Sequence, residues 1–275
     1  MSWRIGLLAT VAVLSAAKTQ AADLSSYEAT YDLRLTHASS TTGPRAVVGT
    51  LESLFAQTCD GWETRSRVVV LLKFRDDTEM SNETLFSSWE SKNSEKYKFT
   101  VRTFRNSEAE QAYSGSAALT KSGGRAQYDV PPVGKEKVRP VIVALPRGSL
   151  FPVAHSKALL SHAERGDILF SSVVLNGASY KGPRMMSTAI GPRVASQNID
   201  ASSAIDENLL DTHFWRMSTA IFGVDEKIEV PNFELAAQLH QSGVTESFEQ
   251  TFGDFALAAK LTGLRRLPAP ACVKR

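Results

Sequence analysis

YEATYDLRLT, residues 27–36, is the stretch that decides the fold, because apolar and polar side chains alternate along it without a break. Its apolar members are Tyr27, Ala29, Tyr31, Leu33 and Leu35. Successive side chains of a β-strand point to opposite faces, so the alternation predicts an antiparallel strand with one buried face. Beyond it, turn residues recur about every 10–15 positions, a spacing typical of an all-β meander.

Further strands are predicted from the same pattern. They are expected at residues 46–57, 62–74, 78–89, 96–105, 111–119, 167–175, 184–195, 212–222, 227–240, 246–251 and 255–264. Two segments, 233–240 and 255–261, hold enough Ala and Leu to be helices by propensity. Gly243 follows the first of these segments and Gly253 precedes the second. These glycines, together with the period of two in residues 233–239, favour strands in hairpins.

One helix is expected, from Val153 to Arg165. Pro152 suits its start and Gly166 its end, and Leu159, Leu160 and Ala163 share one face. A polar loop containing Pro131, Pro132 and Gly134 is expected before it. Asn176-Gly177 predicts a tight hairpin turn after the next strand. The pentapeptide MSTAI occurs twice, at 186–190 and 217–221, which hints at repeated strand geometry.

The N-terminus predicts a secretory signal peptide over residues 1–21. Arg4 precedes an apolar run from Ile5 to Ala17, and small residues precede a cleavage site after Ala21. A run of 13 residues is too short for a membrane span, which needs about 20. Residues 22–275 are then expected to form a single domain in the periplasm, without a transmembrane segment. Cleavage lowers the formal net charge from +2 to 0, which gives no electrostatic case for nucleic-acid binding.

Two cysteines, Cys59 and Cys272, remain after cleavage. In an oxidising compartment such a pair is normally joined, so a disulfide is predicted, with two free thiols as the alternative. Closing so long a loop stabilises the fold by about 5 kcal/mol in the chain-entropy model.

Motifs for chemistry are scarce. The five histidines lack metal-ligand spacing, although His155 and His162 could share a helix face. Neither Gly-x-Ser-x-Gly nor a phosphate-cradling glycine loop occurs. Four glutamates could supply the paired carboxylates of a glycosidase: Glu63, Glu79, Glu83 and Glu90. We expect no catalytic residues, no metal and no cofactor.

A binding surface is a better candidate than an active site. Trp62, Trp89 and Trp215 lie in predicted strands, and Lys98 and Arg102 alternate with aromatic neighbours. Aromatic rings beside positive charges suit acyl chains, glycans or anionic head groups. The alternative is that the three tryptophans belong to the core, which is their more frequent place.

Several segments carry a resemblance to a known family. They are residues 27–33, 59–63 (CDGWE), 89–91 (WES), 96–99, 145–155 (LPRGSLFPVAH) and 215–217 (WRM), together with Cys272. The segment in which Leu-Phe-Pro precedes a helix that starts with His155 is the most specific. In these positions the chain resembles the EipB family of periplasmic cell-envelope integrity proteins, over nearly the whole mature sequence.

The resemblance implies a mainly β fold: a large antiparallel β-spiral, or open half-barrel, wrapped around one central α-helix, with Cys59 bridged to Cys272. It also implies a non-enzymatic role in envelope integrity under stress. The expected partner is a cell-envelope protein, such as a periplasmic helical-repeat scaffold, or a lipid or lipoprotein bound on the concave sheet. Two alternatives stay open: a hydrolase of envelope glycan or peptide, and a purely structural module whose groove is filled by the helix.

Overall fold

The computed structural model describes residues 24–131, 139–196, 204–224 and 230–272, so the predicted signal peptide lies outside the described residues. The described residues form fourteen strands, the helix α1 (Pro152–Glu164) and the short 3-10 helix η1 (Glu207–Leu209). The strands are β1 (Tyr27–Ala38), β2 (Ala46–Gln57), β3 (Gly61–Lys73), β4 (Glu79–Ser91), β5 (Lys96–Arg105), β6 (Glu108–Thr120), β7 (Gly123–Val130), β8 (Arg139–Leu145), β9 (Leu169–Val174), β10 (Arg184–Ala195), β11 (His213–Gly223), β12 (Phe233–Leu239), β13 (Thr245–Thr251) and β14 (Phe255–Arg266). No helix within these ranges is long and apolar enough to cross a membrane.

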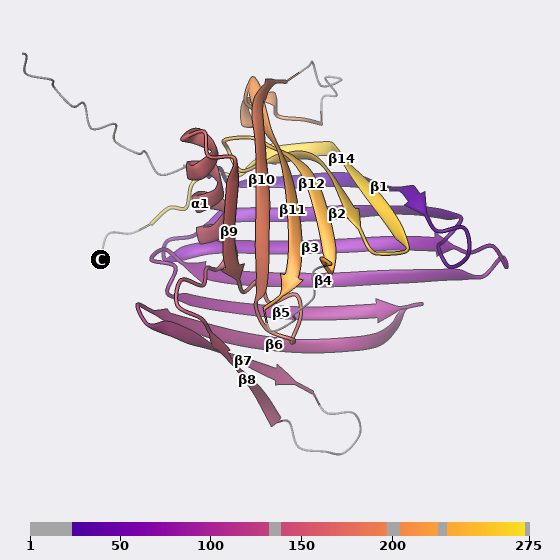
Figure 1. The fold of residues 1–275 in the computed structure, drawn as a ribbon, viewed down its shortest axis with the longest axis horizontal. Helices are drawn as coiled ribbons and strands as arrows, with labels where there is room; N and C mark the ends of the chain where they lie inside the picture. Colours follow the sequence, from indigo (N-terminus) through magenta and orange to yellow (C-terminus); the bar gives the residue numbers. More distant parts are fainter. Residues whose placement is uncertain (1–23, 132–138, 197–203, 225–229, 273–275) are drawn as a thin grey trace, which may run out of the picture.

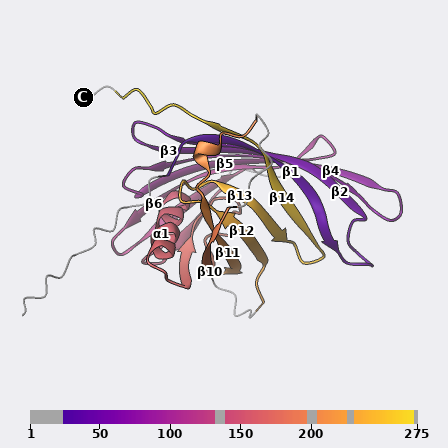
Figure 2. The same cartoon turned by 90° about the horizontal axis from the view of Figure 1, so that it is seen from above.

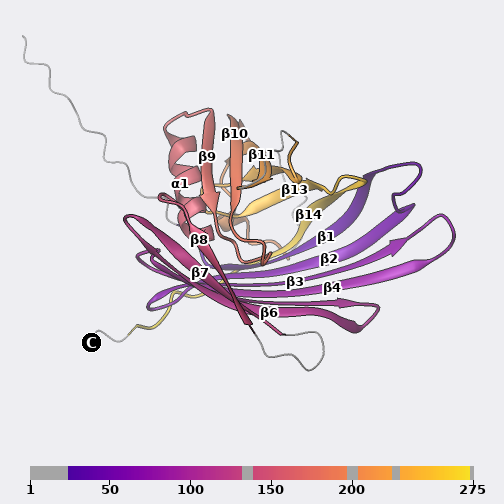
Figure 3. The same cartoon turned by 60° about the horizontal axis from the view of Figure 1, so that its bottom comes forward.

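All fourteen strands form one antiparallel sheet in the order β8-β7-β6-β5-β4-β3-β2-β1-β14-β13-β12-β11-β10-β9. The first and last strands of the chain are therefore neighbours in the middle of the sheet, and β8 and β9 are its two edges. A twisted sheet of this many strands does not stay flat. β1–β6 form a trough, and β9–β13 with α1 lie over it with their strands crossing the trough (Figure 1, Figure 3). The predicted fold class is confirmed.

The trough has two ends, which we call the helix end and the open end. The helix end holds α1, the β2–β3 turn and the β4–β5 turn, whereas the open end holds the β1–β2 and β3–β4 hairpins. Seen from above, the hairpins of the open end extend away from α1 (Figure 2). The helix runs across the strands of the trough and not along them (Figure 1).

The strand predictions agree with the structure to within a few residues in most places, with three exceptions. Both ambiguous segments are strands, β12 and β14, as the period of two favoured. β7 and β8 were not predicted. Pro140 stands near the start of β8, which tolerates proline because it is an edge strand. The predicted strand 227–240 begins at Phe233, and its residues 227–229 lie outside the described ranges, as do residues 132–138 of the predicted polar loop.

The prediction of a tight hairpin at Asn176-Gly177 is wrong. Residues 175–183 form a longer loop between β9 and β10 that reaches the inner face of the trough. There the hydroxyl of Tyr97 donates to the carbonyl of Asn176 (2.9 Å), and that of Tyr113 donates to the carbonyl of Gly177 (3.1 Å). Gly177 has φ +74° and lies so close to the Phe99 ring that a Cβ would be 2.5 Å from it. These contacts across the layers, which sequence spacing does not reveal, fix the loop.

The two MSTAI pentapeptides pair with each other as neighbouring strands. Met186 lies opposite Ile221 and Ile190 lies opposite Met217, so the two copies run antiparallel about a local two-fold axis. Their central threonines meet at the axis, where the hydroxyls of Thr188 and Thr219 are 2.9 Å apart and buried. The repeat is therefore a self-complementary strand pair.

The disulfide joins the C-terminal tail to the helix end. Cys59, in the β2–β3 turn, is bonded to Cys272, which is 213 positions further along the chain. The tail that follows β14 is anchored where the amide of Leu267 donates to the carbonyl of Ser26 (2.9 Å). The bridge therefore fixes a tail that lies beyond the sheet's own hydrogen-bond ladders.

Candidate ligand-binding site

The open end of the trough contains an apolar pocket of about 410 Å³. Its floor comes from β1–β4 and its opposite wall from β13 and β14. The apolar lining includes Leu51, Val68, Val70, Leu72, Phe248 and Phe255. We call this cavity the inner pocket.

Strand alternation and register build the floor of the inner pocket. Val68, Val70 and Leu72 are alternate residues of β3, so they share the inner face. The register places Thr84 of β4 opposite Val68 and Asn82 opposite Val70. The floor is thus aliphatic on β3 and polar on β4.

Phenylalanines form the opposite wall. The rings of Phe252 and Phe255 are stacked with centroids 5.1 Å apart, and Phe248 packs edge-on against Tyr31 at 5.8 Å. The hydroxyl of Tyr31 donates to the carbonyl of Thr245 (2.8 Å), and burial, with a smaller contribution from Tyr27, raises its pKa far above the usual range. Tyr31 therefore stays neutral, and its ring supports Phe248, which lines the inner pocket.

The polar groups of the inner pocket are few and uncharged. Asn82, Thr84 and Gln250 supply them, and no Asp, Glu, Lys, Arg or His is among the lining residues. The side-chain oxygen of Asn82 is shielded from solvent and has no hydrogen-bond partner. An unpaired charge would be costly in this setting, so the pocket suits an apolar ligand.

At the helix end the same trough is filled. Leu159, Leu160 and Ala163 of α1 pack in one core cluster with Trp62 and Trp215, and each of these five side chains is at most 8% exposed. The helix therefore plugs only one end of the trough. The alternative of a groove wholly filled by the helix does not describe this structure, because the inner pocket remains.

Glu90 holds the start of α1. Its carboxylate accepts hydrogen bonds from the backbone amides of Val153 (2.7 Å) and Ala154 (3.0 Å), two of the donors that a helix N-terminus leaves unpaired. The side chain is 1% exposed, and this burial raises the pKa of Glu90, although the two amides, Ser94 and Lys157 act in the opposite direction. Glu90 is a structural residue that locks the helix to β4.

His155 is the second buried titratable group of the helix end. Its ring packs against Phe170 with centroids 5.6 Å apart, and its Nε2 has no hydrogen-bond partner. Burial lowers its pKa to about 4. His162 also contacts Phe170, at 4.3 Å, so the two histidines share a helix face as predicted, with a packing role.

The predicted surface residues separate into two groups. Trp62 and Trp215 are 5% and 4% exposed, so the prediction that they form a ligand or partner surface is wrong; they pack around α1. The Lys157 ammonium caps the Trp62 ring at 4.7 Å. Trp89 and Lys98, in contrast, form a cross-strand pair on the outer face of the trough.

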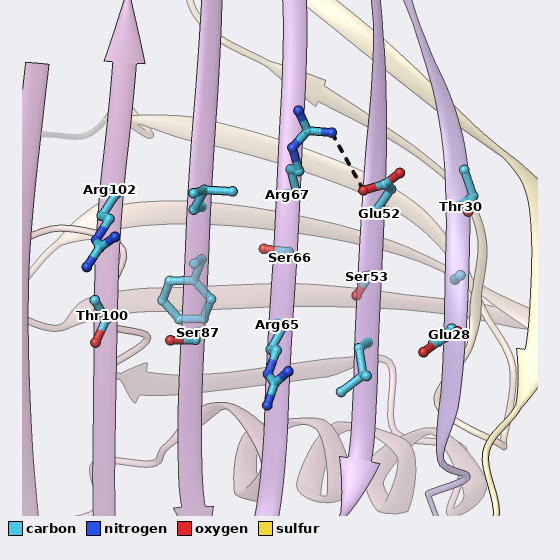
Figure 4. Close-up of a pocket in the computed structure, with 14 residues that line it drawn as sticks. Glu28, Thr30, Glu52, Ser53, Arg65, Ser66, Arg67, Ser87, Thr100 and Arg102 are labelled. Atoms are coloured by element: carbon cyan, nitrogen blue, oxygen red, sulfur yellow. Dashed lines mark ion pairs between the residues drawn. The ribbon is translucent and has the colours of Figure 1, made fainter. Parts of the chain in front are cut away.

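Arg102 lies on the same outer face, in a depression of about 680 Å³ that also holds Arg65, Arg67 and Glu52 (Figure 4). Four of the five charged residues that line the depression form ion pairs, with each other or with residues outside its lining, and Arg102 is the exception. Arg67 contacts Glu83 at 2.7 Å and Glu52 at 3.8 Å. This surface is largely a solvated ion-pair network, and such exposed pairs contribute little to stability.

The four glutamates considered for glycoside hydrolysis do not converge. Glu63 is paired with Arg65, Glu79 with Lys73 and Glu83 with Arg67, whereas Glu90 caps the helix on the other face of the sheet. Within the described residues no serine hydroxyl bonds to a histidine, and no three His, Cys, Asp or Glu side chains cluster as metal ligands.

Sequence reasoning missed the inner pocket. Its floor was predicted as strands, but the opposing β13 and β14 come from the other end of the chain, and no local pattern reveals that meeting. One signal was available in the sequence: the inward-facing positions of β4 change from the apolar Met80 to the polar Asn82 and Thr84. A polar amide at such a position can mark a pocket.

Comparisons with known proteins agree with this architecture. The sequence profile of a family described as EipB-like matches residues 18–268. A solved structure, the β-barrel-like protein of the domain of unknown function DUF1849 from Brucella abortus, superposes with a TM-score of 0.78 and 20% sequence identity. The match covers 90% of this chain and 100% of that one. No curated protein matches the sequence.

Proposed function

The chain belongs to the EipB-like family, and on this basis we propose that it is an exported periplasmic protein that supports cell-envelope integrity by binding a lipid acyl chain in the inner pocket. The ligand is a free lipid or the acyl chain of a lipoprotein. The disulfide supports an oxidising compartment. The family resemblance supports the envelope role. A helical-repeat partner protein remains a prediction.

The inner pocket is the observation that carries the proposal. Ligand sites are typically concave and mostly apolar, with a few placed polar groups, and the inner pocket has this composition. A binding role is also supported over hydrolysis, because the four glutamates considered for glycoside hydrolysis are engaged in ion pairs or in capping α1. We therefore propose a non-enzymatic mode of action.

The test measures apolar binding to the purified mature chain. N-phenylnaphthylamine fluorescence should rise on binding, and myristic acid should displace the dye. Val70→Asp places an unpaired charge in the pocket and should weaken binding about tenfold or more. Val69→Asp is the matched control, since its side chain faces the outer side of the same strand.

The two variants decide the outcome together. Both must keep the wild-type circular dichroism spectrum, so that a loss of binding reports the pocket and not unfolding. Equal binding by wild type and Val70→Asp, or no dye binding by the wild type, would refute the proposed function.

A further inference from the structure

A second depression on the outer face of the trough adjoins the one that holds Arg102. It has a volume of about 450 Å³ and is lined by residues of β3 to β7, including Trp89 and Lys98. The two depressions share Ser87 and Thr100, so they form one groove that crosses β1 to β7. Six inter-strand spacings give it a length of about 29 Å. We call it the outer groove, and Figure 4 shows its part from β1 to β5.

Trp89 supplies an aromatic surface in the outer groove. A Cβ on Gly61 would lie 2.8 Å from the Nε1 and 2.9 Å from the Cε2 of Trp89, so the missing side chain lets the indole rest against β3. The indole Nε1 makes no hydrogen bond within the described residues, and it is not among their solvent-shielded unpaired atoms. Trp89 is half-buried, so its ring is supported by the sheet and accessible from the groove.

Two cations of the outer groove are uncommitted. Lys98 and Arg102 lie on either side of Thr100 on the outer face of β5, about 14 Å apart along the strand. Both are exposed, and neither side chain forms an ion pair or a hydrogen bond with another described residue. The other cations of the lining, Arg65 and Arg67, are paired with glutamates. Lys98 and Arg102 are therefore available to anionic groups of a ligand.

Hydroxyls and carboxylates lie beside these cations. The lining includes Ser114, Ser116, Glu63 and Asp129. Sugar hydroxyls both donate and accept, so they match such a mixture, and the apolar C–H face of a sugar ring packs on the electron-rich face of an indole. A nucleic acid fits less well, because the carboxylates would repel its closely spaced phosphates.

We propose that the outer groove binds an acidic glycan, with a sugar ring on Trp89, anionic groups of the glycan on Lys98 and Arg102, and sugar hydroxyls on Asp129. The inference goes beyond the proposed function, because it adds a second site on the opposite face of the sheet from the inner pocket. The two sites can therefore fail independently.

The experiment is isothermal titration calorimetry of the full mature chain with matched probes. Alginate hexasaccharide carries one carboxylate on each sugar, maltohexaose is a neutral glycan of the same length, and hexaglutamate carries the carboxylates without sugar rings. Wild type should bind the alginate probe about fivefold or more tightly than either of the others. Disaccharide-peptides released by a muramidase from a bacterial cell wall are a second acidic probe, which distinguishes a cell-wall source of the glycan from a polysaccharide source.

Three variants locate the binding. Trp89→Ala should weaken binding of the acidic glycan about fivefold or more, because the stacking surface is lost. Lys98→Gln combined with Arg102→Gln should weaken it about threefold or more and leave maltohexaose unaffected. The matched control combines Lys96→Gln with Arg125→Gln, which removes two exposed charges from the same outer face but outside the lining of the groove. The control should bind like wild type.

Each variant must keep the wild-type circular dichroism spectrum, and if Trp89→Ala misfolds, the two double variants decide. Three results would overturn the inference: no saturable binding of either acidic glycan by wild type, equal affinity for hexaglutamate and the alginate probe, or an equal loss of affinity in the two double variants. Dye binding in the inner pocket is independent of all three, so the proposed function is judged by its own test.

Discussion

The helix end and the open end of the trough are built from the same strands, yet one is sealed and the other is hollow. At the helix end Leu160 is fully buried, whereas at the open end Val70 stays partly exposed beside the inner pocket. The difference follows from the direction of α1. A helix that crosses the strands fills about its own diameter, roughly 10 Å, of strands that run about 40 Å.

In this architecture the residues that stabilise the fold and the residues that would bind a ligand lie at opposite ends of the trough. Packing around α1 uses aromatic residues, a buried carboxylate and a disulfide at the adjacent turn. The open end keeps uncharged side chains that have room to receive a ligand. Substitutions at the helix end should therefore change the free energy of unfolding, and substitutions at the open end should change affinity.

The largest expected effect is at the helix end. Leu160→Ala should lower the free energy of unfolding by about 2–5 kcal/mol, because it opens a cavity in a closed cluster. Val70→Ala should lower it by only about 1 kcal/mol, because its site already faces a cavity. Urea denaturation measures both. Equal losses would show that the two ends are packed alike and would break the comparison.

The disulfide gives the next effect in size. Cys59→Ser should destabilise the protein by about 2–4 kcal/mol, seen as a melting temperature several degrees lower in oxidising buffer. Cys272→Ser should do the same, since either change removes the one bridge. Dye binding at 25 °C should persist, because the bridge lies at the helix end. An unchanged melting temperature would show that the disulfide does not stabilise the folded protein.

Acid should weaken the helix end through His155. In the unfolded chain the imidazole takes up a proton near pH 6.5, whereas in the folded chain it stays neutral down to about pH 4. The unfolded state binds more protons in that window, so the free energy of unfolding falls as the pH falls, by up to about 3 kcal/mol. The raised pKa of Glu90 acts in the opposite direction and offsets part of this loss.

Replacement of His155 isolates this contribution. In His155→Phe the melting temperature should fall less between pH 7 and pH 4.5 than in wild type. Affinity for the uncharged dye should not change from pH 7 to pH 5.5, because no titratable side chain lines the inner pocket. If the melting temperature of His155→Phe falls as much as that of wild type, titratable groups other than His155 cause the acid sensitivity.

The sequence predicted the strands of the trough well, because a period of two is a local signal and the Tyr27–Leu35 alternation is nearly undisturbed. The helix bounds were within one residue, since Pro152 and Gly166 mark them locally. The burial of Trp62 and Trp215 could not be predicted with certainty, because it depends on where α1 packs. The inner pocket was hidden for the same reason: β4 and β13 meet only after the sheet has curled.

Photoaffinity labelling tests the central claim most directly, namely that the open end of the trough is a ligand site and the helix end is not. A diazirine-bearing acyl chain would be bound to the mature protein, irradiated, and its adducts located by mass spectrometry. Adducts should fall on residues 68–72, 80–84 and 248–257, and free myristic acid should suppress them. Adducts confined to α1 or to the outer face around Arg65 and Arg102, or labelling that myristic acid does not suppress, would contradict the account.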